Sequence, residues 1–465
     1  DISHSIPVMI TQLSSIRSFY NTHATLPYAF RKQQLLALKK AVTDHEEAIY
    51  AALRTDLHKS REECWVTENG FLLAELDHAI RSLSEWMQPE KVRTNLLNFP
   101  SASYIRHEPA GVALIIGPWN YPLQLSLAPL VGAIAAGNCA VLKPSEFAPA
   151  TAAVIQQIIE TAFSPDYILC VQGDGASIIG GMMQDFVFDH VFYTGGAVTG
   201  KKIYSMAAEK LVPVTLELGG KSPCIVESDA DIEVAAKRIV MTKFSNAGQM
   251  CVAPDYILVH ASRKEALITA MKEKILRFFG GDMEHTEHYG RIINEKQFDR
   301  ILRYLQDGKI IAGGRHHRES LFIEPTLLEY MTPDAVVMQE EIFGPVLPVI
   351  PFDDNDQALQ VIHKHPDPLA FYVFTQSHKK EKYWLDAVPS GGACINNASW
   401  HLTNPHLPFG GRGTSGMGAY HGRFSFDTFS RKRAVMKTPV WFDPSIKYPP
   451  FKGKLPLFKW LMKRG

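Results

Sequence analysis

The sequence predicts an α/β protein of two lobes, each built around a parallel sheet. The chain has 465 residues, whereas a single hydrophobic core stops growing at roughly 250 to 300 residues. From Gly111 onward, short and almost wholly apolar runs alternate with helix-length segments, which is typical of strands that helices cover on both faces. The alternation starts afresh after Gly219. We therefore expect one sheet before that residue and one after it.

The first lobe is expected to open with helices and to continue as a doubly wound sheet. Residues 31–87 show the apolar spacing of helices, and Pro89 ends it. Strands and helices that alternate in this way form a Rossmann-type half. The strands are predicted at 112–116, 139–142, 167–171, 190–193 and 212–216, with helices near 123–136, 149–163, 175–183 and 199–210.

The second lobe repeats the same alternation with different lengths. Its runs are rich in the β-branched and aromatic residues that favour strands. Strands are predicted at 224–226, 257–259, 346–352 and 371–374, with helices near 231–245, 263–279 and 355–364.

Composition argues against several kinds of partner. The 48 basic and 48 acidic residues cancel, so no net field attracts nucleic acid. No stretch reaches the roughly 20 apolar residues of an integral membrane span, and neither H-E-x-x-H nor a Cys/His cluster with zinc spacing predicts a metal site. The six cysteines are scattered without a C-x-x-C pair, and no secretory signal is visible. Reduced thiols and a cytoplasmic location fit this pattern best.

Two residues suggest covalent catalysis. Cys251 ends the segment 244–251, and it lies 34 residues beyond Glu217, which follows an apolar strand and precedes two glycines. A thiolate can capture an acyl group, and a carboxylate can activate the water that releases it. The alternatives are a buried structural thiol and a carboxylate buried beside a partner.

Polar residues and glycines follow the predicted strands at the edge where doubly wound sheets bind ligands. Asn120 either donates to a developing oxyanion or caps a turn. Lys143 and Glu146 either bind ribose hydroxyls or are solvated charges, and Glu146 would repel a 2′-phosphate, which favours NAD over NADP. Gly195 and Gly200 bracket a helix start that favours a phosphate, although such a turn is often only structural.

The same glycine turn raises a P-loop nucleotide hydrolase as a rival. Residues 195–201 match G-x-x-x-x-G-K. Lys202, however, stands where a P-loop needs Ser or Thr to bind Mg²⁺, so this alternative is disfavoured.

Seven motifs resemble the NAD(P)-dependent aldehyde dehydrogenase superfamily in order and spacing, over most of the chain. The short N-terminus and the sequence of residues 246–256 resemble the class 3 branch, which includes fatty aldehyde dehydrogenases. The motifs are Pro118-Trp-Asn-Tyr-Pro122, Lys143-Pro-Ser-Glu146, Phe192-Tyr-Thr-Gly195, Glu217-Leu-Gly-Gly-Lys221, Gly248-Gln-Met-Cys251, Glu341-Ile-Phe-Gly-Pro345 and Pro408-Phe-Gly-Gly411.

The resemblance implies that Cys251 attacks an aldehyde carbonyl while the Asn120 amide and the Cys251 backbone N–H hold the oxyanion. It implies that Glu217 activates the hydrolytic water, with Glu341 as the alternative base. The cofactor contacts that it implies are Lys143 and Glu146 at the adenosine ribose, Gly195 and Gly200 at the pyrophosphate, Glu341 at the nicotinamide ribose, Phe343 beside the ring, and Trp119, Thr194 and Leu218 around the same pocket.

The family's fold implies a cofactor-binding domain at 1–92 and 107–217, a catalytic domain at 218–393, and a strand arm at 93–106 and 394–440 that pairs across a homodimer. A C-terminal extension follows at 441–465. Its last part, from Pro444 to Gly465, holds six basic residues, no acidic residue and four aromatic rings. It is expected either to touch anionic lipid peripherally or to pack over the substrate mouth or on the partner subunit, and packing is favoured.

The function that we expect is NAD(P)⁺-dependent oxidation of an apolar, aliphatic or aromatic, aldehyde to the carboxylate. An acylating dehydrogenase is the competing enzyme, but it can lack a water-activating carboxylate. A catalytically idle NAD-binding scaffold is disfavoured by the presence of both Cys251 and Glu217. A thiol hydrolase would need a His as base, and no His lies in the motifs that frame the site.

Overall fold

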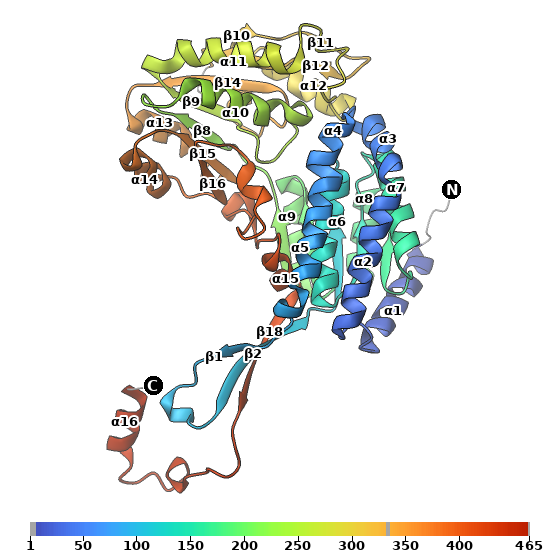
Figure 1. Cartoon of the computed structure of the whole chain (residues 1–465), viewed down its shortest axis with the longest axis vertical. Helices are drawn as coiled ribbons and strands as arrows, with labels where there is room; N and C mark the ends of the chain where they lie inside the picture. Colours follow the sequence, from blue (N-terminus) through green and yellow to red (C-terminus); the bar gives the residue numbers. More distant parts are fainter. Residues whose placement is uncertain (1–5, 332–334, 464–465) are drawn as a thin grey trace.

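Two sheet-containing lobes and a projecting arm make up the molecule. The structure is a computed structural model and describes residues 6–331 and 335–463. One lobe holds a six-stranded sheet, the other a seven-stranded sheet, and the arm a three-stranded sheet. In Figure 1 the seven-stranded lobe lies above the six-stranded lobe, and the arm extends below both. The predicted α/β class with two mainly parallel sheets is confirmed.

The six-stranded sheet has the order β17-β7-β6-β3-β4-β5. Its four pairings from β7 to β5 are parallel, and β17 joins the edge in the antiparallel sense. All five strands predicted for the first lobe are confirmed, with small shifts at their ends. The strands are β3 (Val112–Ile116), β4 (Cys139–Lys143), β5 (Ile168–Cys170), β6 (His190–Thr194), β7 (Val214–Glu217) and β17 (Gly416–Met417).

The strand order reverses at β3, which pairs with β4 on one side and with β6 on the other. Doubly wound sheets bind their ligands outside the carboxyl ends of the strands at such a switch point. Asn120 follows β3, and Thr194 is the last residue of β6. The topology therefore places both at the expected crevice.

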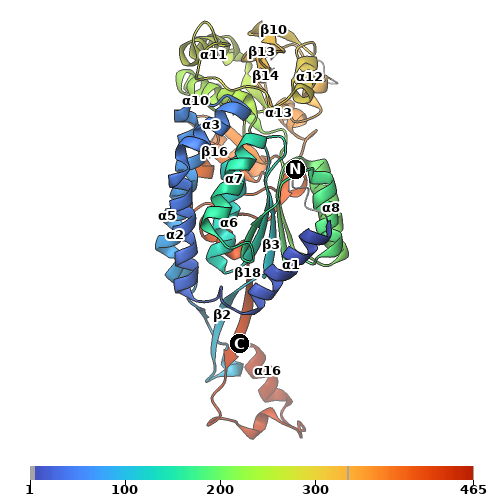
Figure 2. The same cartoon turned by 90° about the vertical axis from the view of Figure 1, so that its right-hand side faces the viewer.

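Helices cover both faces of this sheet. All side chains of α6 (Pro122–Ala136) are buried, as expected of a helix that is apolar on every side. Figure 2 shows α6 and α7 on one side of the sheet and α8 on the other, with α2 and α5 as a further layer outside α6. The helices are α1 (Ile6–Asn21), α2 (Tyr28–Asp44), α3 (Glu46–Leu57), α4 (Arg61–Cys64), α5 (Gly70–Trp86), α7 (Pro149–Ala162), α8 (Gly175–Asp185) and α9 (Ala197–Glu209), and one π-helical turn, η1 (Trp65–Asn69), joins α4 to α5.

The seven-stranded sheet has the order β10-β13-β14-β9-β8-β15-β16, and β10 is its antiparallel strand. The four strands and three helices predicted for this lobe are confirmed, and three strands and two helices were not predicted. The strands are β8 (Pro223–Val226), β9 (Tyr256–His260), β10 (Lys309–Ala312), β13 (Thr326–Glu329), β14 (Val346–Phe352), β15 (Ala370–Phe374) and β16 (Gly392–Ile395), and the helices are α10 (Ile232–Phe244), α11 (Lys264–Phe279), α12 (Glu295–Tyr304), α13 (Asn355–Ile362) and α14 (His378–Ala387).

The arm is a three-stranded antiparallel sheet with β2 in the centre. Its strands are β1 (Glu90–Val92), β2 (Ala102–Pro109) and β18 (Ser430–Lys437), and α15 (Arg423–Thr428) leads into β18. The C-terminal helix α16 (Leu455–Lys463) lies at the far end of the arm, near the short η2 turn (Leu96–Asn98), and away from both lobes (Figure 1). The extension therefore does not cover the cavity of its own chain, contrary to one of our expectations.

Candidate active site

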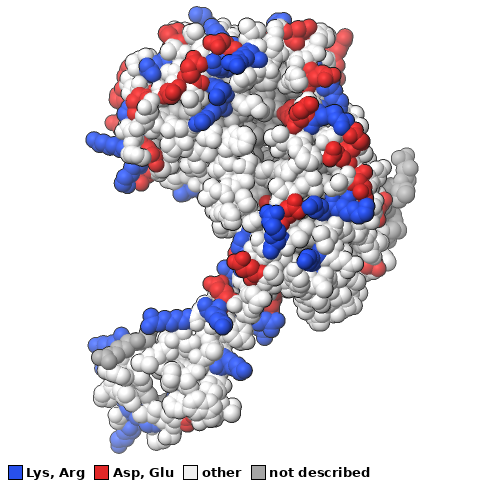
Figure 3. All heavy atoms as spheres, in the orientation of Figure 1, with Lys and Arg blue, Asp and Glu red and all other residues white. Residues whose placement is uncertain are grey.

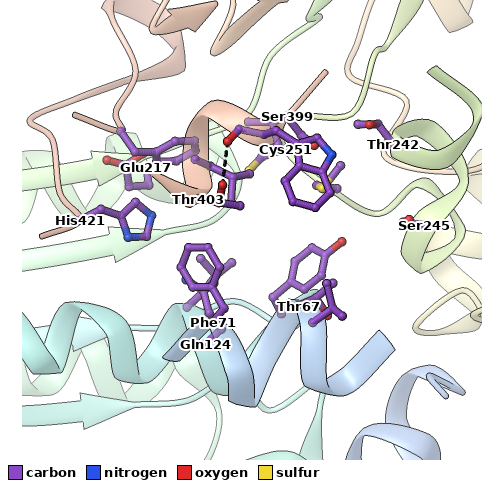
Figure 4. Close-up of a pocket in the computed structure, with 18 of the residues that line it drawn as sticks. Thr67, Phe71, Gln124, Glu217, Thr242, Ser245, Cys251, Ser399, Thr403 and His421 are labelled. Atoms are coloured by element: carbon purple, nitrogen blue, oxygen red, sulfur yellow. Dashed lines mark hydrogen bonds between the residues drawn. The ribbon is translucent and has the colours of Figure 1, made fainter. Parts of the chain in front are cut away.

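A cavity of about 180 Å³ lies between the lobes and holds both predicted catalytic residues. Cys251 and Glu217 line it together, and Figure 4 shows their side chains on the same wall, above Phe71 and Gln124 from the helices below. Most of the remaining wall is apolar. Apolar side chains that line it include Phe71, Leu125, Met241, Met250, Trp400 and Phe409.

The exposed lining residues show which end of the cavity opens to solvent. The side chains of Val66, Met241 and Trp400 are 60%, 51% and 53% exposed, whereas Glu217 is 3% exposed. Glu217 therefore lies at the deep end, and the three exposed side chains mark the mouth.

Cys251 lies in a turn between α10 and β9. The preceding residues are unusual, because Asn246, Ala247 and Gly248 have φ values of 50°, 51° and 75°. Only glycine adopts this left-handed region at little cost, and a side chain at Gly248 would also meet the backbone of Gly344. Such a conformation persists only where its surroundings hold it, and strained backbone of this kind concentrates at functional sites.

Hydrogen bonds tie this strained segment to the loop that carries Asn120. The Asn246 side-chain amide donates to the Asn120 carbonyl oxygen at 2.8 Å. The Asn120 side-chain amide donates to the carbonyl oxygen of Gln249 at 3.1 Å, and the Asn246 backbone N–H donates to Glu63 Oε1 at 2.8 Å. One N–H of Asn120 is thus used to hold the chain beside Cys251.

A buried ion pair supports the same loop from behind. Lys59 and Glu68 are both fully buried and lie 2.7 Å apart, and the Lys59 ammonium also donates to the Asn120 carbonyl oxygen at 3.1 Å. It lies 4.0 Å from the ring centroid of Tyr121, and Glu68 accepts from the backbone N–H of Gln124. Burial raises the pKa of Glu68 and the Lys59 charge opposes that rise, so each charge depends on the other.

We expect Lys59→Met to lower the free energy of unfolding by about 3 to 5 kcal/mol, because it leaves Glu68 as a buried carboxylate without its counter-ion. The urea midpoint of unfolding, followed by circular dichroism, measures the loss. Lys40→Met is the matched control, because Lys40 and Asp44 form an exposed pair of side chains, and such pairs contribute about 1 kcal/mol or less. Equal midpoints for the two variants would contradict the role of Lys59.

Glu217 ends β7 with its carboxylate at the deep end of the cavity. Neither of its carboxylate oxygens has a hydrogen-bond partner among residues 6–331 and 335–463. Burial raises the pKa of Glu217 well above its ordinary value. A buried polar group without a partner is costly, and native structures retain it mainly where function needs it. The arrangement therefore favours a functional Glu217 over a carboxylate buried beside a partner.

Glu341, the alternative base, lies against Gly219 and Gly220, the two glycines that follow Leu218. Its carboxylate accepts from the Gly220 backbone N–H and occupies the space where Gly219 would carry a side chain. Burial, followed by the charge of Asp255, raises the pKa of Glu341 to about 8. Unlike Glu217, Glu341 is not part of the cavity wall.

Burial is the main cause that raises the pKa of the Cys251 thiol, and the carboxylates of Glu341 and Glu217 raise it further. The reactive thiolate is therefore scarce at neutral pH.

We expect the rate of iodoacetamide alkylation at Cys251 to rise about tenfold per pH unit between about pH 7 and 9, because the fraction of thiolate rises about tenfold per pH unit below the pKa. Peptide mass spectrometry at timed intervals measures it. A rate that levels off below about pH 8 would show a thiol with a lowered pKa.

The predicted cofactor contacts lie along the carboxyl edge of the six-stranded sheet. Lys143, at the end of β4, pairs with Glu146 at 2.9 Å, and Glu146 also accepts from the Gly175 backbone N–H at 3.0 Å. The buried hydroxyl of Thr194 has no hydrogen-bond partner within the described chain. The space beside Gly196, which begins α9 without a side-chain cap, is open. An unpaired hydroxyl and an uncapped helix start fit a phosphate-bearing ligand.

The other predicted contacts divide into two groups. Trp119 and Phe343 lie edge to face, with ring centroids 5.3 Å apart, and so bring together the loops after β3 and before β14. Helix α9 packs closely against Leu218 at Gly200, where any side chain would meet the Leu218 side chain. Gly200 thus serves close helix packing in this structure. No group of His, Cys, Asp or Glu side chains suited to a metal ion occurs in the part of the chain that the structure describes.

The fold and the cavity are those expected of an NAD(P)-dependent oxidoreductase. A sequence model of the aldehyde dehydrogenase family matches residues 13–435, and the chain belongs to this family. It is 44% identical over 452 residues to 4,4'-diaponeurosporen-aldehyde dehydrogenase of Staphylococcus aureus, covering 96% of this chain and 97% of that protein. The chain is also 41% identical to aldehyde dehydrogenase family 3 member B1 of Rattus norvegicus, and the match covers 95% of each protein. The expected class 3 resemblance is confirmed.

Solved structures agree with this assignment. The substrate-bound state of Staphylococcus aureus AldH matches with a TM-score of 0.95 and 43% identity, covering 97% of this chain and 99% of that chain. The NAD⁺ complex of an aldehyde dehydrogenase from Bacillus cereus matches with a TM-score of 0.83 and 27% identity, over 93% of this chain and 89% of that chain. The protein is an aldehyde dehydrogenase that uses NAD(P).

Several residues of the site were not predicted. His421 and Tyr420 line the cavity with Cys251, and both lie outside the motifs that frame the site. Lys59 and Glu68 were also missed. Nothing in the sequence marks His421, because it follows a glycine-rich loop far from the other motifs, and its position depends on how the chain returns to the six-stranded sheet.

Proposed function

We propose that Cys251 attacks the carbonyl carbon of an apolar aldehyde and that Glu217 completes the reaction by activating water. The observation that carries this proposal is that the thiol and an unpaired, buried carboxylate share one apolar cavity. Attack forms a carbon–sulfur bond and places negative charge on the former carbonyl oxygen. The Asn120 side-chain amide and the Cys251 backbone N–H are the donors for that oxygen.

Residues on the other side of the site would hold the dinucleotide. Bound NAD(P)⁺ supplies a hydride acceptor, so that the carbon held by Cys251 becomes a thioester. Thr194, Leu218 and Trp119 would shape the pocket. Lys143 and Glu146 would bind the adenosine ribose, Gly195 and Gly200 would line the pyrophosphate region, Glu341 would hold the nicotinamide ribose, and Phe343 would lie beside the ring.

Glu217 would then remove a proton from the water that attacks the thioester. The carbon–sulfur bond breaks, the carboxylate product leaves, and Cys251 returns to its starting form. The pKa of Glu217 is raised by burial, and a raised pKa makes a carboxylate a stronger general base. The cavity wall supports Glu217 in this role over Glu341, because only Glu217 lines it.

The apolar wall supports aliphatic or aromatic aldehydes of medium or long reach as substrates. Polar substrates would lose hydration there without gaining hydrogen bonds. The Staphylococcus aureus relative, named for 4,4'-diaponeurosporen-aldehyde, is consistent with this class.

NADH formation by the purified chain from hexanal, benzaldehyde and decanal tests the proposal. We expect NADH and free carboxylate in equal amounts with NAD⁺ and water alone. A requirement for coenzyme A or phosphate would instead identify an acylating dehydrogenase. No NADH from any aldehyde would overturn the proposal.

We also propose that the chain forms a homodimer through the arm. The proposed domains are a cofactor-binding domain at 1–92 and 107–217, a catalytic domain at 218–393 and the bridging arm at 93–106 and 394–440. An arm that projects from the lobes supports it (Figure 1), and so does the exposed edge of β18. Sedimentation equilibrium of the full chain tests the proposal, which a monomer at micromolar concentration would overturn.

For the extension at 441–465 we propose peripheral contact with an anionic membrane surface in the cytoplasm. Trp441, Leu455 and Met462 are 77%, 60% and 73% exposed, and Figure 3 shows Lys and Arg side chains around the end of the arm. Apolar and basic groups together favour anionic lipid. All six cysteines are unpaired, which supports a reducing compartment. No helix within the described residues is long and apolar enough to cross a membrane.

Flotation with liposomes that contain phosphatidylserine tests this contact. The intact chain should float with the liposomes and a chain that ends at residue 440 should not. Equal recovery of both at the bottom of the gradient would place the extension on the partner subunit instead.

A further inference from the structure

His421 and Glu75 lie between the catalytic cavity and a second hollow on the outside of the molecule. His421 lines the catalytic cavity, and Figure 4 shows its ring below Glu217 and beside Phe71. Glu75, on α5, lines the outer hollow. Val66, Phe71 and Thr403 line both spaces, so a wall one side chain thick separates them.

The two side chains are buried and face each other. His421 is 3% exposed and Glu75 6%, and His421 Nδ1 lies 3.8 Å from Glu75 Oε2. The other oxygen, Oε1, accepts from the Gly422 backbone N–H at 2.6 Å. His421 Nδ1 has no hydrogen-bond partner in the described part of the chain. The gap exceeds a direct hydrogen bond by about 1 Å, which a small movement or one bridging water closes.

Aromatic rings fix the imidazole in this place. His421 stacks on Tyr420 with ring centroids 4.0 Å apart, and the rings of Phe71 and Phe409 meet it at 5.4 and 5.6 Å. Its backbone has a φ of 78°, a conformation that costs energy for a residue with a side chain. An aromatic wall would complete this apolar cavity at lower cost than a buried His and Glu.

The reaction proposed above needs a path for protons. Each turnover releases two protons, both from the water that attacks the thioester, because Cys251 loses its thiol proton on attack and regains a proton when it leaves the thioester. Glu217 receives a proton at the deep end of the cavity, while a long apolar substrate fills the mouth and displaces the water there. A proton then has no aqueous path through the mouth until the product leaves.

We propose that His421 and Glu75 form a side exit that carries protons from the catalytic cavity to the outer hollow. This inference rests on the proposed function. The neutral ring accepts a proton from cavity water on one nitrogen and releases the proton on Nδ1 to Glu75, which passes it to water in the outer hollow. No charge accumulates on the ring, because one proton enters as another leaves, and exchange with water restores the Nδ1–H tautomer once the product has left the cavity.

The ionisation of both groups suits this transfer. Burial lowers the pKa of His421 to about 3, so that the ring keeps one N–H and one lone pair at neutral pH, and burial raises the pKa of Glu75 to about 7. The titratable groups that face the pair are Tyr420 and His401, with Glu217 and Cys251 across the cavity.

Substrate length provides the sharpest test. For Glu75→Gln we expect an unchanged burst of NADH, because Cys251 chemistry is intact. We expect steady-state turnover of decanal to fall about tenfold or more, a loss typical of a removed proton carrier, and turnover of acetaldehyde, which leaves the mouth open to water, to stay within about twofold. Glu85→Gln, an exposed carboxylate on the same helix, is the matched control and should behave as wild type.

His421→Ala gives an independent readout. Added imidazole should restore its decanal turnover, because a free base can replace the lost ring, whereas a purely structural defect would not respond. An equal loss for both aldehydes, or no loss in either variant, would overturn the exit. If Glu75→Gln gives no burst, that variant has misfolded, and the results with His421→Ala then decide whether the exit exists. If wild type forms no NADH from any aldehyde, the proposed function fails, and the exit with it.

Discussion

Cys251→Ala is expected to abolish NADH formation, with a loss of at least about 10⁴-fold in kcat/KM. The alanine cannot form the carbon–sulfur bond, and the whole reaction passes through that bond, so the loss should be of the size seen when a covalent nucleophile is removed. Spectrophotometric NADH formation from hexanal at saturating NAD⁺ measures it. The cavity is largely retained in this variant, so aldehyde binding should persist in equilibrium dialysis.

Cys394→Ala is the matched control for this experiment. Cys394 is a half-buried free thiol like Cys251, and its sulfur lies 3.3 Å from His401 Nδ1. It is not among the residues that line the catalytic cavity. The control should keep nearly full activity. If Cys251→Ala retained more than about 1% of wild-type turnover, a covalent mechanism at this sulfur would be untenable.

Glu217→Gln is expected to give one NADH per active site and then to stall. Acylation needs Cys251 and the oxyanion donors, which the substitution leaves in place, whereas the neutral amide cannot take a proton from water. Loss of a general base typically slows the dependent step about 10² to 10⁴-fold. Stopped-flow NADH absorbance measures the burst, and intact-protein mass spectrometry should detect a Cys251 thioester that carries the acyl group of the aldehyde.

The pH dependence distinguishes Glu217 from Glu341. Only the carboxylate form of the base is active, and burial raises the pKa of Glu217, so wild-type deacylation should increase as pH rises above the ordinary titration range of a carboxyl group. The increase should vanish in Glu217→Gln. Glu341→Gln should keep a complete turnover with a raised KM for NAD⁺, because Glu341 is proposed to hold the ribose. Normal turnover in Glu217→Gln together with a stall in Glu341→Gln would assign the base to Glu341.

The elements that the sequence predicted are those that are buried on all sides. Every residue of β3, β4 and β6 is buried, so each strand stands out as an apolar run. The missed elements bury only part of their surface. Helix α12 buries Phe298, Ile301 and Tyr304 among charged residues, and β16 is half-buried along its length because it forms the edge of its sheet. Partial burial leaves a weak pattern in the sequence.

The candidate site was predictable where its residues end a strand or flank glycines, as Glu217 and Cys251 do. The residues behind them were not. Lys59 reaches Asn120 across 61 positions of sequence, and Glu75 reaches Gly422 across 347. Local patterns show that Lys59 or Glu75 is charged, but only the tertiary fold determines which backbone group it meets. The proton exit therefore could not have been inferred before the structure.

The bond from the Asn246 backbone to Glu63 joins positions 183 residues apart, and it has a consequence for how the enzyme becomes active. The left-handed backbone before Cys251 is held from outside by the helices around Lys59 and Glu63. A chain from which cleavage has removed this N-terminal layer would keep the sulfur but release the turn that aims it. Catalytic competence of Cys251 therefore depends on a part of the chain that lies far from it in sequence.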